Sequence, residues 1–60
     1  LPHLKLQAVG GTRPYYWFVD GQLAEARTSQ LNLSPEQHHH QVVLLDQFGH
    51  TAMVSLHFQQ

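Results

Sequence analysis

This sequence predicts an all-β fold. It indicates short strands joined by tight turns, and it shows no helical period. Apolar residues alternate with polar ones along several segments, which is the period of half-buried strands. Turn sequences rich in Gly, Asp and Pro separate those segments. The 60 residues are too few for a full seven-strand sandwich. We therefore expect a reduced, antiparallel, immunoglobulin-like β-sandwich of about six strands, forming a single domain.

The first two strands are expected at residues 4–8 and 14–19. Leu4, Leu6 and Ala8 alternate with polar residues, and Gly10-Gly11 ends that strand. Residues 14–19 form a dense aromatic run that leads directly into Asp20-Gly21. That dipeptide suits a type I′ turn, because both central residues need a positive φ.

The third strand is expected from Gln22 to about Arg27, as the return arm of this hairpin. A helix there is compatible with residue propensity, but Gly21 serves the turn instead of a helix cap. The two-residue turn sets the register between the second and third strands. It places Val19 opposite Gln22, Phe18 opposite Leu23, Trp17 opposite Ala24, and Tyr15 opposite Ala26.

A short fourth strand is expected at Leu31-Asn32-Leu33. Ser34-Pro35 should end it, because proline cannot donate a hydrogen bond to a strand ladder.

The fifth and sixth strands are expected at about His39–Asp46 and His50–Phe58. The segment between them fits a three-residue loop, in which Asp46 opens a type I turn and Gly49 takes the left-handed conformation. The resulting register pairs Asp46 with His50, Leu44 with Ala52, Val42 with Val54, His40 with Leu56, and His39 with His57.

This register separates the two faces of the last hairpin. The face that carries Val42, Leu44 and Val54 is expected to be the core. Val43, Leu45 and Met53 lie on the opposite face and are more apolar than is usual for side chains in contact with solvent. The residues that we expect to be buried are Leu6, Trp17, Val42, Leu44, Val54 and Leu56.

Composition excludes several classes of partner. The formal net charge is −1 with only three Lys or Arg residues, so no nucleic-acid partner is expected. No apolar run approaches the length that spans a bilayer, so we expect no membrane contact by this domain itself. The absence of cysteine excludes disulfides and thiolate zinc sites, and we expect no cofactor.

The six histidines are potential metal ligands, because neutral imidazole commonly binds metals. Consecutive side chains on a strand point to opposite faces, so His38, His39 and His40 cannot converge on one ion. The pairing of His39 with His57 supplies two nitrogens, but no acidic residue is placed to complete a zinc site. We predict no metal site, with His39 and His57 as weak candidates. Protonating all six histidines takes the formal net charge from −1 to +5, in the mildly acidic range where imidazole titrates.

Other side chains have expected structural or binding roles. Trp17 is expected to fill the core, whereas Tyr15 and Tyr16 are the candidates for surface contacts. His40 is expected to be structural, with a ring nitrogen bonded to a turn carbonyl. The remaining structural candidates are the turn residues Asp20, Gly21, Asp46 and Gly49.

The order of these motifs resembles a known family. Gly10-Gly11, the run Arg13-Pro14-Tyr15-Tyr16-Trp17-Phe18-Val19-Asp20-Gly21 and the segment from His40 to Gly49 occur in sequence. Together they resemble the small C-terminal domain of bifunctional class A penicillin-binding proteins of the 1C type, over nearly the whole chain. One departure is that Ser34-Pro35-Glu36-Gln37 stands where that family usually has Pro-Gly ahead of its His.

The resemblance implies a parent protein that is a peptidoglycan synthase anchored in the inner membrane, with its catalytic domains in the bacterial periplasm. The present chain would then be an accessory domain excised from its C-terminus. Transpeptidation requires Ser-x-x-Lys and Lys-Thr-Gly motifs, and Lys5, the single lysine of this chain, belongs to neither. We therefore expect no catalytic residue in this domain, and catalysis in the parent to depend on residues outside it.

Three functions remain open. The favoured one is a non-catalytic interaction module that uses sheet edges or the Tyr15 and Tyr16 region to contact its own synthase or an envelope protein. It predicts a contiguous, exposed apolar patch. The second is a peptidoglycan-binding module with exposed tyrosine rings. The third is a metal-responsive or pH-responsive element built from His39 and His57.

Overall fold

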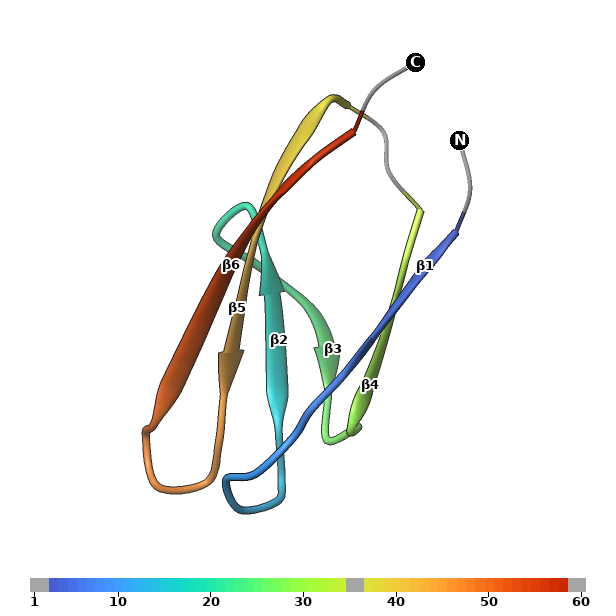
Figure 1. Cartoon of the computed structure of the whole chain (residues 1–60). Helices are drawn as coiled ribbons and strands as arrows, with labels where there is room; N and C mark the ends of the chain where they lie inside the picture. Colours follow the sequence, from blue (N-terminus) through green and yellow to red (C-terminus); the bar gives the residue numbers. More distant parts are fainter. Residues whose placement is uncertain (1–2, 35–36, 59–60) are drawn as a thin grey trace.

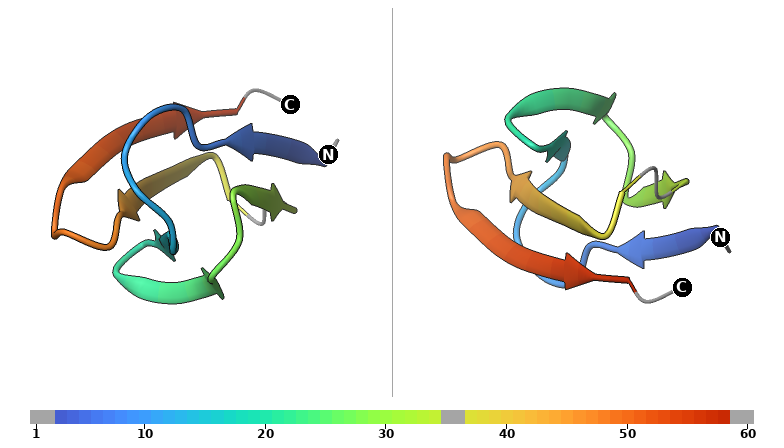
Figure 2. Two further views of the ribbon diagram at one scale, coloured as in Figure 1. Left: turned by 90° about the horizontal axis from the view of Figure 1, so that it is seen from below. Right: turned by 90° about the horizontal axis from the view of Figure 1, so that it is seen from above.

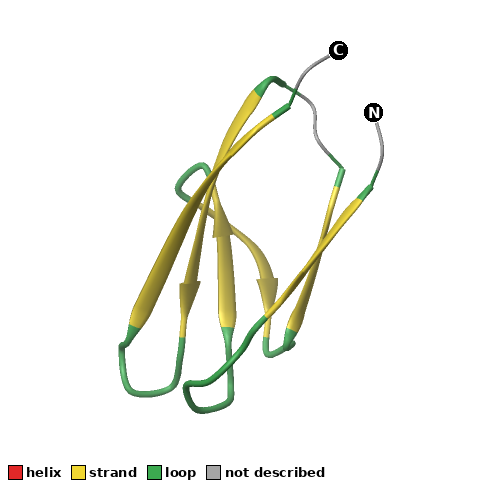
Figure 3. Cartoon of the chain, viewed as in Figure 1, coloured by secondary structure: helices red, strands yellow, loops and turns green. Residues whose placement is uncertain are grey.

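Six β-strands make up the regular structure of the chain in a computed structural model that describes residues 3–34 and 37–58 (Figures 1 and 3). No helix occurs in these ranges. The strands are β1 (Leu4–Gln7), β2 (Tyr16–Val19), β3 (Gln22–Ala26), β4 (Gln30–Leu33), β5 (His39–Leu45) and β6 (Thr51–His57).

The strands form two antiparallel sheets. One has four strands in the order β3-β2-β5-β6, and the other pairs β1 with β4. Seen along the strands, β1 lies on the side of β6 and β4 on the side of β3 (Figure 2). The predicted small, all-β, antiparallel fold is confirmed, and most strand boundaries agree with the prediction within two residues.

The hairpin at Asp20-Gly21 forms as predicted, but its register shifts. Asp20 and Gly21 have φ values of 53° and 83°, and the two pairs nearest the turn match the prediction. A β-bulge then inserts one extra residue on β3, so that Trp17 lies opposite Glu25 and Tyr16 opposite Ala26. The predicted pairings of Trp17 with Ala24 and Tyr15 with Ala26 are therefore wrong.

The second hairpin, between β5 and β6, agrees with the prediction throughout. The expected pairs from Leu44 with Ala52 to His39 with His57 all occur, and the N–H of Asp46 donates to the carbonyl of His50 at 3.0 Å. Gly49 has a φ of 84°, and its N–H donates to the carbonyl of Asp46 at 3.2 Å. The glycine is needed there because a left-handed residue closes this three-residue loop.

The core lies between the two sheets. Trp17, Leu31 and Val42 are its buried members, and five half-buried residues pack against them: Leu6, Ala8, Val19, Leu44 and Leu56. Of the six residues predicted to be buried, Trp17 and Val42 are. Val54 is 44% exposed, so the prediction that it is buried is wrong. Its strand lies at the edge of the sheet, where no further strand within residues 3–34 and 37–58 covers it.

Strand β4 contributes more to the core than its sequence suggested. Leu31 is 1% exposed and Leu33 8% exposed, because β4 pairs with β1 and directs both leucines toward the four-stranded sheet. The strand ends at Leu33, followed by Ser34, whose hydroxyl lies 2.7 Å from Nδ1 of His3. Pro35, the predicted cause of that ending, lies outside the described residues.

Candidate interaction surface

Trp17 is held in the core by packing and by one directed hydrogen bond. Its side chain is 3% exposed, and its Nε1–H donates to the carbonyl of Thr28 at 2.8 Å. The bond connects β2 to the segment between β3 and β4. The predicted core role of Trp17 is confirmed, which removes its ring from any surface contact.

Asp20 joins the first hairpin turn to strand β5. Its Oδ1 accepts a hydrogen bond from the backbone N–H of Gln41 at 2.9 Å, and its Oδ2 lies 2.7 Å from Nδ1 of His40. His40 is 6% exposed. At its Nδ1, this ring contacts the carboxylate of a turn residue; the bond to a turn carbonyl that the sequence predicted stays a prediction.

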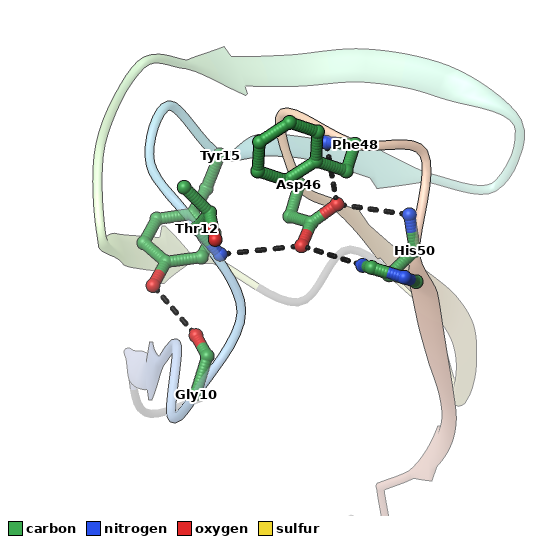
Figure 4. Close-up of polar contacts among 6 residues, drawn as sticks. All are labelled: Gly10, Thr12, Tyr15, Asp46, Phe48 and His50. Atoms are coloured by element: carbon green, nitrogen blue, oxygen red, sulfur yellow. Dashed lines mark hydrogen bonds and ion pairs between the residues drawn. The ribbon is translucent and has the colours of Figure 1, made fainter.

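Asp46 is the centre of a second polar network (Figure 4). Its Oδ1 accepts hydrogen bonds from the backbone N–H groups of Phe48 at 2.9 Å and His50 at 2.8 Å. Its Oδ2 accepts from the backbone N–H of Thr12 at 3.2 Å and lies 3.1 Å from the ring Nδ1 of His50. Asp46 is 5% exposed. It therefore connects the β5–β6 turn to the segment that follows β1, residues 10–12, which we call the glycine segment.

Both carboxylates are stabilised in their charged form. For Asp46, desolvation acts to raise the pKa, but the hydrogen bonds from His50, Thr12 and Phe48 outweigh it and hold the pKa below its ordinary value. For Asp20, the hydrogen bond from the backbone of Gln41 and then that from His40 lower the pKa against a smaller desolvation effect. These contacts occupy both carboxylates in structural roles.

The two tyrosines, which are the predicted contact residues, differ in their surroundings. Tyr15 is 8% exposed, and its hydroxyl donates to the carbonyl of Gly10 at 2.6 Å (Figure 4). The segment after β1 folds back over this ring, so Tyr15 is the buried tyrosine of the two candidates. Tyr16 is half-buried on the opposite face of β2. Whether either tyrosine binds a ligand stays a prediction.

An apolar surface lies on the side of the four-stranded sheet that faces away from β1 and β4. The register aligns Leu23, Phe18, Val43 and Met53 in one row across all four strands, with Tyr16 and Leu45 in the adjacent row. We call these six residues the outer face. Leu23 is 56% and Met53 64% exposed, and the other four are half-buried. The sequence signalled Val43, Leu45 and Met53, but β2 and β3 could be added only when the sheet order was known.

A cationic hollow lies beside β2 and β3. It has a volume of about 460 Å³ and is lined by Arg13, Pro14, Tyr15, Arg27, Thr28 and Ser29. The chain has three Lys and Arg residues, and two of them are here. Arg27 has a φ of 62°, and its N–H donates to the carbonyl of Tyr15 at 2.7 Å. Sequence analysis missed this hollow because Arg13 and Arg27 are distant in the chain.

The histidine candidates do not assemble a metal site within the described part of the chain. His39 and His57 face each other across β5 and β6 with ring centroids 4.7 Å apart. No group of three or more His, Cys, Asp or Glu side chains suited to holding a metal ion is found among residues 3–34 and 37–58.

Comparison with known proteins identifies the family. The model of the penicillin-binding protein C-terminus family matches residues 2–56, nearly the whole chain. No curated protein and no solved structure matches significantly, so the immunoglobulin-like type of the sandwich stays a prediction. Within the described residues, the structure has no helix long and apolar enough to cross a membrane. On the evidence of the family match, this chain belongs to the penicillin-binding protein C-terminus family.

Proposed function

We propose that this chain is a non-catalytic interaction module of a bifunctional peptidoglycan synthase, and that it acts in the bacterial periplasm. Family membership supports its place in a penicillin-binding protein. The absence of Ser-x-x-Lys and Lys-Thr-Gly from the sequence supports a role outside acyl transfer. The module would contact the catalytic domains of its own synthase or another envelope protein.

The observation that carries this proposal is the outer face. Its central row crosses every strand of the larger sheet and ends in two strongly exposed residues, Leu23 and Met53. Contiguous apolar surface rimmed by polar residues is typical of protein interaction sites. The carboxylates of Asp20 and Asp46, by contrast, hold the turns and β5 in place through hydrogen bonds within the chain.

The test compares two variants of the full-length synthase with the parent. Leu23→Lys combined with Met53→Lys places charges at both ends of the outer face and should release the module from its partner. Phe48→Lys is the matched control, because Phe48 is 69% exposed but lies in the β5–β6 turn. Limited proteolysis reports release of the module, and a fluorescent β-lactam reports acylation. We expect faster cleavage at the module boundary in the double variant alone, with acylation retained in both.

A result in which deletion of residues 1–60 abolishes acylation would contradict the proposal, since the module would then be a structural part of the transpeptidase. Equal cleavage of the double variant, the control and the parent would also count against the outer face as the contact surface.

A second candidate function, binding of peptidoglycan, is favoured by the cationic hollow. Paired arginines suit carboxylates, which the peptide stems of the wall polymer carry, and the volume lies in the range of ligand sites. The double variant Arg13→Gln, Arg27→Gln should then lower co-sedimentation of the chain with peptidoglycan sacculi. Lys5→Gln is the control, because it removes a positive charge outside the hollow, and it should leave co-sedimentation unchanged. Unchanged co-sedimentation would remove this candidate.

A further inference from the structure

Strand β6 has one edge that no other described strand pairs with. The N–H of Asp46 donates to the carbonyl of His50 at 3.0 Å, and the N–H of Phe58 donates to the carbonyl of His38 at 2.6 Å. Hydrogen-bonded pairs alternate along an antiparallel ladder, so the even-numbered residues of β6 bond to β5. The residues that direct N–H and C=O groups to the free edge are Thr51, Met53, Ser55 and His57.

This edge lacks the features that usually prevent strands from pairing. Natural edge strands are short, charged, bulged or interrupted by proline. Among the described strands, β1 and β4 have four residues each and β1 carries Lys5, while β3 carries Glu25 and contains the bulge. Strand β6 has seven residues and contains no Asp, Glu, Lys or Arg, no proline and no bulge.

An apolar seam runs alongside the same edge, between β6 and β1. One hollow of about 170 Å³ is lined by Leu6, Gln7, Trp17, Val42, Leu44, Ala52, Met53 and Val54. A second, of about 130 Å³, shares Leu44 and Ala52 and continues to Val9 and Gly10. Both are smaller than the sites that hold drug-sized ligands and suit single side chains. Val54 faces the interior side of its sheet and still has 44% of its surface exposed at this seam.

The charged side chains near the free edge of β6 indicate which kind of segment could pair with it. Strands β1, β5 and β6 carry Lys5, His39, His40 and His57 but no Asp or Glu. Asp46, which follows β5, already accepts four hydrogen bonds. An incoming strand with carboxylates at its solvent-facing positions therefore meets no like charge on these three strands, whereas a second copy would bring its own Lys5 to the same edge.

We infer that β6 accepts an extended segment of the synthase's own polypeptide as an added strand. The segment has apolar side chains at alternate positions, which fill the seam, and acidic ones between them. Its backbone pairs with the free edge of β6, the binding mode called β-augmentation. A segment on the same polypeptide has a high effective concentration near the edge. This inference rests on the proposed function and specifies its partner.

Amide-resolved hydrogen exchange compares the full-length synthase with the isolated 60-residue chain. We expect exchange at Met53 and Ser55 to be at least about tenfold slower in the synthase, because their N–H groups gain partners. Ala52 and Val54, whose N–H groups bond to β5, serve as internal references and should change little.

Ser55→Pro supplies the decisive variant. It removes an N–H that points to the free edge and leaves the ladder with β5 intact, so the module should stay folded while the added strand is lost. Ser55→Ala removes the hydroxyl, keeps the N–H, and should behave as the parent. Fast exchange at Met53 in the Ser55→Pro synthase, with slow exchange in Ser55→Ala, is the expected result.

Other results would overturn the inference. Fast exchange at Met53 and Ser55 in the unmodified synthase would show that no strand is added. Protection that appears in the isolated chain and rises with its concentration would assign the edge to a second copy. If Ser55→Pro leaves protection unchanged while the Leu23 and Met53 variant still releases the module, the inference fails and the proposed function stands.

Discussion

The carboxylate of Asp46 accepts a hydrogen bond from the backbone N–H of Thr12, which lies 34 positions earlier in the chain. The carbonyl of Thr12 in turn accepts from the N–H of Gln47 at 3.0 Å. Two bonds thus join the segment between β1 and β2 to the β5–β6 turn. In a domain that buries a modest share of its chain surface, such a tie between distant segments contributes to stability beyond the apolar core.

Stability should fall when the medium becomes strongly acidic. Asp20 and Asp46 both have a pKa below its ordinary value in the folded chain, so the unfolded chain takes up protons first as the pH falls. Their contribution is complete above the ordinary carboxyl pKa of about 4 and is lost as the pH drops through the folded values. Urea unfolding at pH 7, 5, 4 and 3 should show the midpoint falling mainly below pH 5.

Asp46→Asn is the control for this pH dependence. An amide accepts hydrogen bonds through its oxygen alone, so its NH₂ group faces either the N–H of Thr12 or those of Phe48 and His50. The variant should be less stable at pH 7 and should lose less stability than the parent between pH 5 and pH 3. A decline as steep as that of the parent would assign the acid sensitivity to other groups.

Two adjacent glycines should differ in their tolerance of alanine. Gly10 and Gly11 have φ values of 79° and 69°, so a side chain at either position costs about 1–2 kcal/mol of backbone strain. Only at Gly11 would the new Cβ also crowd neighbours, lying 3.2 Å from Oδ2 of Asp46 and 3.4 Å from Cε1 of Tyr15. Gly11→Ala should lower the urea midpoint more than Gly10→Ala. Equal losses would show that the Asp46 network can move aside.

Local patterns predicted the fold well where a turn determined the geometry. Asp20-Gly21 and the loop ending at Gly49 predicted both hairpins, and the β5–β6 register followed completely. The bulge opposite Trp17 was not predictable from turn length, because an inserted residue on β3 leaves the turn unchanged. The burial of Leu31 depended on β4 pairing with β1, a contact between segments distant in sequence.

The candidate site was less predictable than the fold, because surfaces depend on sheet order. Alternation indicated that Tyr15 and Tyr16 face opposite ways, but only the path of the glycine segment determined that Tyr15 is the buried one. Val54 has the right period for a core residue, yet its strand is at an edge. Periodicity identifies the face of a strand and does not tell whether a neighbour covers it.

Replacing Trp17 should unfold the chain. Trp17→Ala leaves a large cavity between the sheets and should cost about 3–5 kcal/mol, which is comparable with the total stability of about 3–9 kcal/mol for a domain of this length. Trp17→Phe retains most of the packing but loses the donor to the carbonyl of Thr28, so it should cost about 1–3 kcal/mol. Circular dichroism during thermal unfolding measures both. An Ala variant as stable as the Phe variant would contradict the central role of this ring.

The neighbouring residues His39 and His40 offer the sharpest test of how the first hairpin is attached to β5. His40 is buried, pairs with Asp20 at 2.7 Å, and packs edge-on against Phe58 with ring centroids 6.1 Å apart. His39 is exposed on the opposite side of the strand and stacks only on His57 among the aromatic contacts of the described residues.

His40→Ala should therefore lower the urea midpoint clearly, because it removes a core-edge ring and a partner of the Asp20 carboxylate, whereas His39→Ala should change it little. Combining His40→Ala with Asp20→Asn separates the two effects. If the pair acts as a unit, the double variant loses less stability than the sum of the single variants. Strict additivity would mean that the contact between His40 and Asp20 adds no stability, and that the turn at Asp20 is held by its hydrogen bond from Gln41.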